Sequence, residues 1–389
     1  MWYFRSPEVV FGQDSLDHLK QLTGQRALIV TDPTMIKLGY VDLVMAKLQA
    51  AGITSRVFSE VEAEPSVETI QRGAAAMTDY QPDWIVGLGG GSPIDAAKAM
   101  WILYENPDLD ILLVNPFEPV SLRQKAKMVA IAATSGTGAE VTWAIVLTDP
   151  ADQRKVAVGS PANLPDIAIV DPALTGTMPA QLTADTGMDA LTHAIEGYTS
   201  TWHNDFSDGL CLQATRLIFD YLPRAVSQEL DEQAREKMHN AATIAGLGFI
   251  NSMCSLAHAL GHSLGALYHL PHGRCVGLFL PYTIQFNALG DEPTRYQKLA
   301  NFLNLPAVTP GQGAASLVQA IHQLAEEIGQ PRSIRQAVDL SLDQFEANLD
   351  QLVERAETDT QIVTAVRIPT TDDVRLLFRY AYHGQAIDW

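Results

Sequence analysis

The stretch IVGLGGGSPIDAAKA, residues 85–99, runs from an apolar strand through consecutive glycines into a helix. The three glycines at 89–91 carry no side chain, so the backbone can come close to a ligand there. We expect Ser92 to cap the helix, with Asp95 as its capping-box partner and Pro93 in the first turn. The amides and the positive dipole end at such a helix start can hold a pyrophosphate.

The glycine pattern matches a dinucleotide-binding motif only in part. The run GLGGGS, residues 87–92, departs from G-x-G-x-x-G at its last position, and three glycines can also form a turn that binds nothing. A second loop, TSGTGAEVT at 134–142, follows another apolar run and supplies glycine and hydroxyl groups suited to phosphate or ribose. Together the two loops favour a cofactor site.

Two charged residues could complete that site. Asp32 ends the run ALIVTD, where its carboxylate could accept hydrogen bonds from an adenosine ribose and would repel a 2′-phosphate, which favours NAD over NADP. A strand-ending Asp is also commonly a turn or cap residue. Lys155 could supply a cation to the cofactor, or could equally be a solvated surface lysine.

Short apolar runs alternate with amphipathic segments in the first half of the chain. This alternation is typical of a parallel sheet covered by helices on both faces. We expect strands at 27–32, 55–61, 83–89, 128–134, 144–149 and 166–172, and helices at 42–51, 66–80 and 93–104. The opening segment, rich in Phe, Tyr and Val, should add an edge hairpin.

The pattern changes near residue 181 to long stretches with helical period. We expect helices at 208–222, 233–253, 255–269, 313–328 and 373–383. The chain has 389 residues, more than one hydrophobic core usually supports. The predicted organisation is therefore α/β plus all-α, with domains at 1–180 and 181–389 and ligands bound in a cleft between them.

Composition restricts the partners. The chain has 45 acidic and 26 basic side chains, a net charge of -19, which argues against nucleic acid and anionic membranes. Its three cysteines are too few for a disulfide framework or a cysteine-based zinc site. No signal-peptide pattern opens the sequence, and no apolar run approaches the length of about eighteen residues that a membrane span needs. We expect a soluble cytoplasmic protein.

The helical half contains a pattern of metal-ligand residues. Asp189 and His193 lie four residues apart, so a helix would place them on one face. His258 and His262 repeat this spacing, and His272 follows in a Pro-His-Gly loop. Some such pairs arise by chance among ten histidines, but one carboxylate with three imidazoles suits Fe(II) or Zn(II). Spacing alone leaves the choice between His258 and His262 open.

Four motifs, in this order, resemble the iron-containing (group III) alcohol dehydrogenases: GGGSPIDAAK, TSGTGAEVT, DTGMDALTHAIEGYTS and HALGHSLGALYHLPHG. The resemblance covers nearly the whole chain. It implies an N-terminal Rossmann-like dinucleotide-binding domain and a C-terminal helical metal-binding domain. It also implies NAD and a divalent metal, Fe(II) ahead of Zn(II), as cofactors, and a homodimer or larger homo-oligomer.

The resemblance also implies roles for individual residues. The implied metal ligands are Asp189, His193, His258 and His272. His262 would be a second-sphere residue near the nicotinamide and the metal, and we expect it to act as the catalytic residue in the proton relay. The implied cofactor contacts are Asp32, Gly89, Gly90, Gly91, Ser92, Asp95, Thr134, Ser135, Thr137 and Lys155.

The predicted reaction passes a hydride between NAD(H) and a small primary alcohol or aldehyde, with the metal acting as a Lewis acid. The segments 185–200 and 249–273 contain no Lys or Arg, which favours a neutral substrate. A glycerol or polyol dehydrogenase of the same superfamily is the alternative, followed by a metal-dependent lyase or hydrolase. Phe249, Met253 and Cys254 could line a substrate channel or pack in the helix core.

Overall fold

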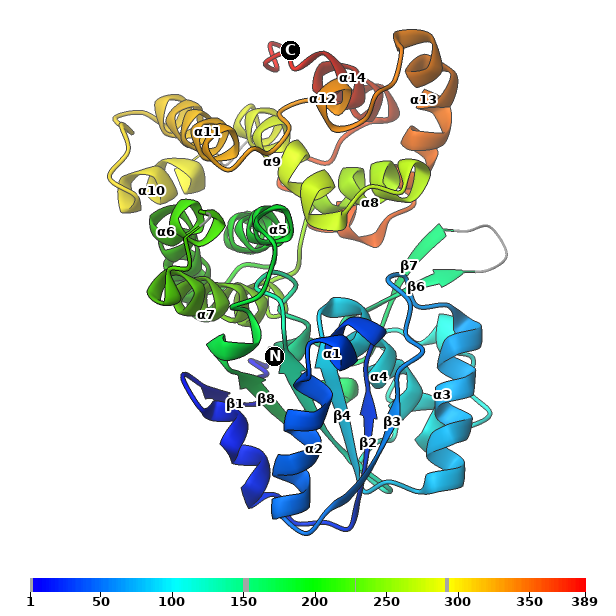
Figure 1. Ribbon diagram of the computed structural model, residues 1–389. Helices are drawn as coiled ribbons and strands as arrows, with labels where there is room; N and C mark the ends of the chain where they lie inside the picture. The colour runs from blue at the N-terminus through cyan, green and yellow to red at the C-terminus, as the bar shows by residue number, and fades with distance from the viewer. Residues whose placement is uncertain (1–2, 150–153, 228, 291–293) are drawn as a thin grey trace. The chain divides into compact units, whose positions relative to one another are not determined.

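The computed structural model describes residues 3–149, 154–227, 229–290 and 294–389. The chain divides into two compact units, Met1–Thr177 and Met178–Trp389. The first unit is built on a six-stranded sheet with the order β1-β8-β5-β4-β2-β3, all of whose neighbours pair in parallel (Figure 1). The strands are β1 (Glu8–Phe11), β2 (Arg26–Val30), β3 (Thr54–Phe58), β4 (Trp84–Gly89), β5 (Lys127–Ala132) and β8 (Ile167–Val170).

Apolar side chains cover both faces of this sheet, as predicted. Along β2, Leu28 and Val30 join one buried cluster while Ala27 and Ile29 join another, because successive strand side chains point to opposite faces. The α-helices of this unit are α1 (Pro33–Lys37), α2 (Tyr40–Ala50), α3 (Val67–Tyr80) and α4 (Gly91–Glu105). Its 3-10 helices are η1 (Ser15–Gln21), η2 (Ile111–Leu113), η3 (Ala139–Val141), η4 (Pro161–Asn163) and η5 (Pro172–Leu174).

The structure differs from two predictions about strand pairing, although the run at 144–149 is a strand as predicted. The opening segment forms no edge hairpin: β1 pairs in parallel with β8, and the chain then enters η1, whose Leu16 amide donates to Asp171. The run at 144–149 forms β6 (Ile145–Asp149), which pairs antiparallel with β7 (Arg154–Val158) in a separate two-stranded sheet. Strands that pair in parallel need a long crossover connection between them, usually an α-helix. Only the short helix η3 lies between β5 and β6, so β6 does not pair in parallel with β5.

The second unit is helical throughout its described residues (Figure 1). Its helices are α5 (Ala180–Thr199), α6 (Asp205–Val226), α7 (Glu232–Phe249), α8 (Leu256–Tyr268), α9 (His272–Ala288), α10 (Thr294–Phe302), α11 (Pro310–Glu327), α12 (Ile334–Ala337), α13 (Leu342–Glu357), η6 (Thr360–Thr364) and α14 (Thr371–His383). One core joins α5, α6 and α7 to α10 and α11, and a second joins α8 and α9 to α13 and α14. No helix among the described residues is long and apolar enough to cross a membrane.

Candidate functional site

The glycine turn between β4 and α4 has little space for side chains. Gly89 has a φ of 144°, and a Cβ there would lie 2.8 Å from Pro93 Cγ. Helix α4 begins at Gly91 with Gly90 as its N-cap and no side-chain cap. The prediction that Ser92 caps this helix was wrong, because the N-cap is Gly90, two residues earlier, and the Ser92 hydroxyl donates to the Ala63 carbonyl. The first-turn amides thus have no side-chain cap and can serve a ligand.

Asp95 is not a capping-box partner either. Its Oδ2 accepts a hydrogen bond from the Val146 amide at 3.0 Å, and its Oδ1 lies 3.2 Å from Lys98 Nζ. Lys98 is fully buried and also donates to the Ala144 carbonyl at 2.9 Å. Burial lowers the pKa of Lys98, against the opposing effect of Asp95 and Glu140. This network ties α4 to strand β6, and a direct contact of Asp95 with the cofactor stays a prediction.

The hydroxyl loop after β5 lies against the glycine turn, because β4 and β5 are neighbours in the sheet. A Cβ on Gly90 would lie 3.2 Å from Thr134 Cγ2, and a Cβ on Gly91 would lie 3.0 Å from Thr137 Cγ2. Ser135, in the same loop, is buried. The structure therefore brings the two predicted loops together into one cradle, with glycines on one side and threonines on the other.

Asp32 lies at the edge of the same cradle. It is the N-cap of α1, where Oδ1 accepts hydrogen bonds from the amides of Thr34 and Met35 at 2.6 and 3.2 Å. Its other oxygen, Oδ2, would be 3.5 Å from a Cβ on Gly89. Asp32 therefore caps α1 with one carboxylate oxygen, as the alternative interpretation expected, and its second oxygen faces the glycine turn. The backbone of Lys155 lies in β7, but its side chain lies outside the described residues.

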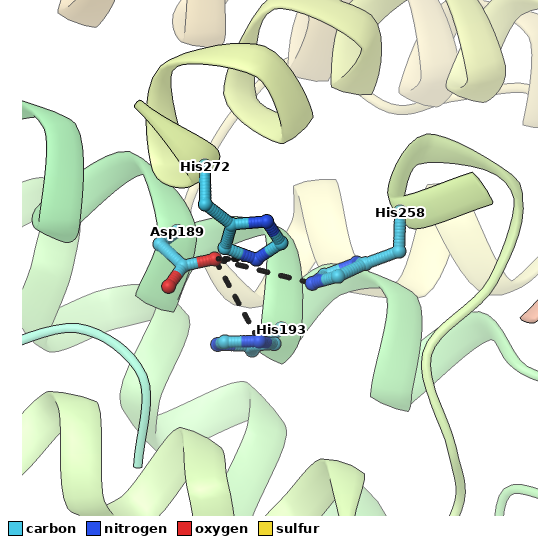
Figure 2. Close-up of side chains that lie close together, drawn as sticks. All are labelled: Asp189, His193, His258 and His272. Carbon is cyan, nitrogen blue, oxygen red and sulfur yellow. Dashed lines mark ion pairs between the residues drawn. The ribbon is translucent and has the colours of Figure 1, made fainter. Parts of the chain in front are cut away.

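In the second unit, Asp189, His193, His258 and His272 point toward one another (Figure 2). Asp189 and His193 lie one turn apart on α5, and His258 lies on α8. His272 was expected in a loop but is the first residue of α9, after the N-cap Pro271. From Asp189 Oδ1, the Nε2 atoms of His272, His193 and His258 lie at 3.2, 3.7 and 3.9 Å.

This arrangement fits a divalent cation. Bonds of about 2.1 Å in a tetrahedral shell place ligand atoms about 3.4 Å apart, close to the three separations found here. Asp189 Oδ1 and His258 Nε2 are buried and have no hydrogen-bond partner among the described residues. Unpaired buried polar atoms are costly unless something else satisfies them. A cation held between them would do so.

The electrostatics of the cluster favour the ligand forms of its members. Burial would raise the pKa of Asp189, but His193 and His272 hold it well below its usual range. Burial lowers the pKa of His193 to about 3, and it lowers the pKa of His258 well below its usual value. A metal needs deprotonated carboxylate and neutral imidazole, the forms that these pKa shifts favour for Asp189, His193 and His258.

Glu196, which sequence reasoning missed, orients His258. Its Oε2 lies 2.6 Å from His258 Nδ1 and accepts from the Ser255 amide at 2.9 Å, and the Ala257 amide donates to its Oε1. Burial raises the pKa of Glu196 to about 7, and the two amides oppose that rise. The available signal was its position three residues after His193, on the same helix. Cys254 also lies near Glu196 and His258, but the Glu196 oxygens are already occupied by these donors.

His262 lies beside the cluster of four and outside it. Its Nδ1 is 2.7 Å from Asp359 Oδ2, and its ring stacks on His272 at 5.1 Å between centroids. Burial would raise the pKa of Asp359, but His262 and the Gln361 amide bring it below its usual value. Asp359 is 97 residues away in sequence, so no local pattern connected it with His262.

Phe249 contacts the cluster directly. Its ring stacks on His193 with centroids 4.2 Å apart. Met253 has a φ of 73°, where the chain leaves α7, and Cys254 is buried. Phe249 therefore packs against a candidate ligand, whereas a substrate-channel role for these three residues stays a prediction.

The fold and the two sites define a class: a two-unit chain with a dinucleotide-type glycine cradle on a parallel sheet and a carboxylate–imidazole cluster for a divalent cation. Residues 6–172 match the family model described as iron-containing alcohol dehydrogenase, and residues 183–382 match the C-terminal model of the Fe-containing alcohol dehydrogenase family. The chain belongs to the iron-containing alcohol dehydrogenase family and is an oxidoreductase of that type. The family predicted from the four motifs is confirmed.

Individual relatives agree with this assignment. The chain is 39% identical to an NADPH-dependent butanol dehydrogenase of Clostridium saccharobutylicum, over 98% of both chains. It also matches an aldehyde-alcohol dehydrogenase of Streptococcus pneumoniae at 37% identity, but spans only 46% of that longer protein.

Two solved structures are similar along almost the entire chain. An iron-containing alcohol dehydrogenase of Thermococcus thioreducens has a TM-score of 0.90 at 31% identity, covering 99% of this chain and all of that one. A sulfoacetaldehyde reductase of Bifidobacterium kashiwanohense in complex with NAD+ has a TM-score of 0.87 at 28% identity, covering 98% of both. Both likenesses agree with the predicted α/β plus all-α fold.

Proposed function

We propose that this protein interconverts a small, neutral primary alcohol and its aldehyde with NAD(H), using a divalent ion held by Asp189, His193, His258 and His272. The observation that carries the proposal is the convergence of three Nε2 atoms on Asp189 Oδ1 at 3.2–3.9 Å. The butanol dehydrogenase relative supports the substrate class. The family description favours Fe(II), with Zn(II) as the second choice.

The bound ion would supply Lewis-acid polarisation of the substrate oxygen. The chain's own residues prepare the site for it. Glu196 accepts a hydrogen bond from His258 Nδ1, which leaves the Nε2 lone pair available to the ion. Phe249 covers the His193 ring and excludes water from that side. Both contacts hold the imidazole rings in place before the substrate arrives.

The first unit would bind the cofactor. The first-turn amides of α4 and its dipole favour a pyrophosphate, and Thr134 and Thr137 border the same turn. Asp32 Oδ2 would accept from the adenosine ribose hydroxyls and repel a 2′-phosphate, which supports NAD. The NAD+ complex of the sulfoacetaldehyde reductase agrees with this preference, whereas the butanol dehydrogenase is named for NADPH.

His262 would receive the proton that the alcohol releases. Asp359 accepts from its Nδ1 and so leaves the other ring nitrogen free to act as a base. An imidazole suits this step because its ordinary pKa lies close to the working pH. Asp359 would also stabilise the imidazolium that forms.

The charge around the cluster supports a neutral substrate. Arg274, two residues after His272, pairs through two hydrogen bonds with Asp185, so its charge is already compensated. A phosphorylated or acidic substrate would need an uncompensated cation nearby. The homo-oligomer and the cytoplasmic location stay predictions.

The test is metal analysis of anaerobically purified protein together with an alcohol and aldehyde panel, followed by absorbance of the reduced nicotinamide. We expect one divalent ion per chain and turnover of 1-propanol and 1-butanol with NAD. His272→Ala should lose the ion and turnover but retain NAD binding. Full activity of metal-free His272→Ala protein would remove the metal from the reaction, and preferential oxidation of glycerol would favour the polyol alternative.

A further inference from the structure

His272 has the least local support of the four candidate ligands. Its side chain is 31% exposed, against 3–6% for the other three. It is also the first residue of α9, where the N-cap Pro271 provides no side-chain hydrogen bond. Glu196 holds His258 and Phe249 packs on His193. The position of His272 must therefore depend on what fixes the start of α9.

A bidentate ion pair fixes that start against α5. Arg274 Nε and one terminal nitrogen donate to the two carboxylate oxygens of Asp185, each at 3.0 Å. Gln330 donates to the same carboxylate at 2.9 Å and Gln181 does so at 3.2 Å. Asp185 is buried and Arg274 is 22% exposed in its side chain, so solvent screens the pair only partly.

Two glycines bring the helices into contact at the same place. A Cβ on Gly273 would lie 2.1 Å from the Asp185 carbonyl oxygen and 2.9 Å from Asp189 Cβ. One turn later, a Cβ on Gly277 would lie 2.7 Å from Met188 Cβ. The two glycines determine how closely α9 approaches α5. The planar guanidinium of Arg274 fits a carboxylate in one orientation, so it determines how far α9 is shifted along the axis of α5.

We infer that Asp185 and Arg274 form a positioning clamp for the metal centre, which holds His272 at the distance from Asp189 that a divalent cation requires. Asp185 precedes Asp189 by one helical turn, and Arg274 follows His272 by two residues. The clamp therefore connects the two helices that contribute the 3.2 Å Asp189–His272 contact. Neither clamp residue is one of the four candidate ligands. This inference rests on the proposed metal centre.

The test uses Co2+ as the probe, added to the metal-free full-length protein, with affinity and the visible absorption spectrum of the bound ion as readouts. In Asp185→Asn and Arg274→Gln we expect the Kd for Co2+ to rise about 10- to 100-fold, as for other residues that orient ligands. The spectrum should also change, since it reports ligand geometry. Arg274→Lys keeps the charge but cannot form the fork, so it should show an intermediate Kd.

The matched control is Arg379→Lys, in a bidentate pair with Glu346 that joins α14 to α13. It should leave the Kd and the spectrum unchanged. Circular dichroism and thermal unfolding identify variants that fail to fold. If Asp185→Asn and Arg274→Gln both fail to fold, the Kd and spectrum of Arg274→Lys test the clamp. Folded variants with the wild-type Kd and spectrum would overturn the clamp. Wild-type protein that binds no Co2+ would instead overturn the metal centre itself.

Discussion

Glu196 Oε2 lies 2.6 Å from His258 Nδ1, inside the second unit, where both side chains are almost fully buried. Because the carboxylate accepts a hydrogen bond, the proton of the neutral His258 ring lies on Nδ1. The unprotonated Nε2 then faces Asp189. Second-sphere contacts of this kind fix the tautomer and the ring orientation of a ligand.

Glu196→Gln should weaken metal binding by about 10- to 100-fold. A glutamine has one acceptor oxygen, whereas Glu196 accepts from two backbone amides and the His258 ring. If the amide nitrogen replaces Oε2, the Ser255 amide and His258 Nδ1 both lose their acceptor, and the ring loses its fixed orientation. Competition with a chelator measures the affinity, and Glu232→Gln on the exposed first turn of α7 is the control. Unchanged affinity in the Glu196 variant would show that the carboxylate does not orient the ligand.

Asp32→Ser should raise the ratio of kcat/KM for NADP to that for NAD roughly five- to tenfold. Serine keeps a cap for α1, which Asp32 provides, and removes the negative charge that would repel a 2′-phosphate. Steady-state kinetics with both cofactors gives the ratio, and the melting temperature reports whether the cap survives. An unaltered ratio in a stable variant would discard the ribose role of Asp32.

His262→Ala should retain the metal and lower kcat by about 10²- to 10⁴-fold, the usual range for loss of a general base. Asp359→Asn should lower kcat less and change its pH profile, because Asp359 acts through His262. Adding Asp359→Asn to His262→Ala should have little further effect on kcat. Metal content is measured in parallel, and its collapse in His262→Ala would mean that His262 is itself a ligand.

The metal-free protein should lose stability on acidification below about pH 6.5. Burial lowers the pKa of His193 from 6.5 to about 3 in the folded state. Between these values the unfolded chain binds more protons than the folded chain. The free energy of unfolding therefore decreases as the pH is lowered, and this residue contributes at most about 1.4 kcal/mol per pH unit. Urea unfolding with a chelator at several pH values measures the slope. His193→Leu should flatten it, and identical slopes would contradict the prediction.

The sequence by itself determined the elements whose information is local. Continuous apolar runs indicated strands β2, β3, β4, β5, β6 and β8, the spacing of Asp189 and His193 placed them on one helical face, and four ordered motifs identified the family. Hydrophobic periodicity and i, i+4 spacing depend only on the path of the chain over a few turns, so they can be read without the fold.

Only the tertiary structure decided which partners these residues meet. Asp95 accepts from the Val146 amide across 51 residues, Asp359 reaches His262 across 97, and Arg274 pairs with Asp185 across 89. The pairing of β6 also depends on the tertiary structure, because its partner is β7, the strand that follows it, and not a strand of the main sheet. A buried carboxylate accepts whichever donors packing brings within about 3 Å. Those donors come from helices and strands far apart in sequence, and no local pattern records them.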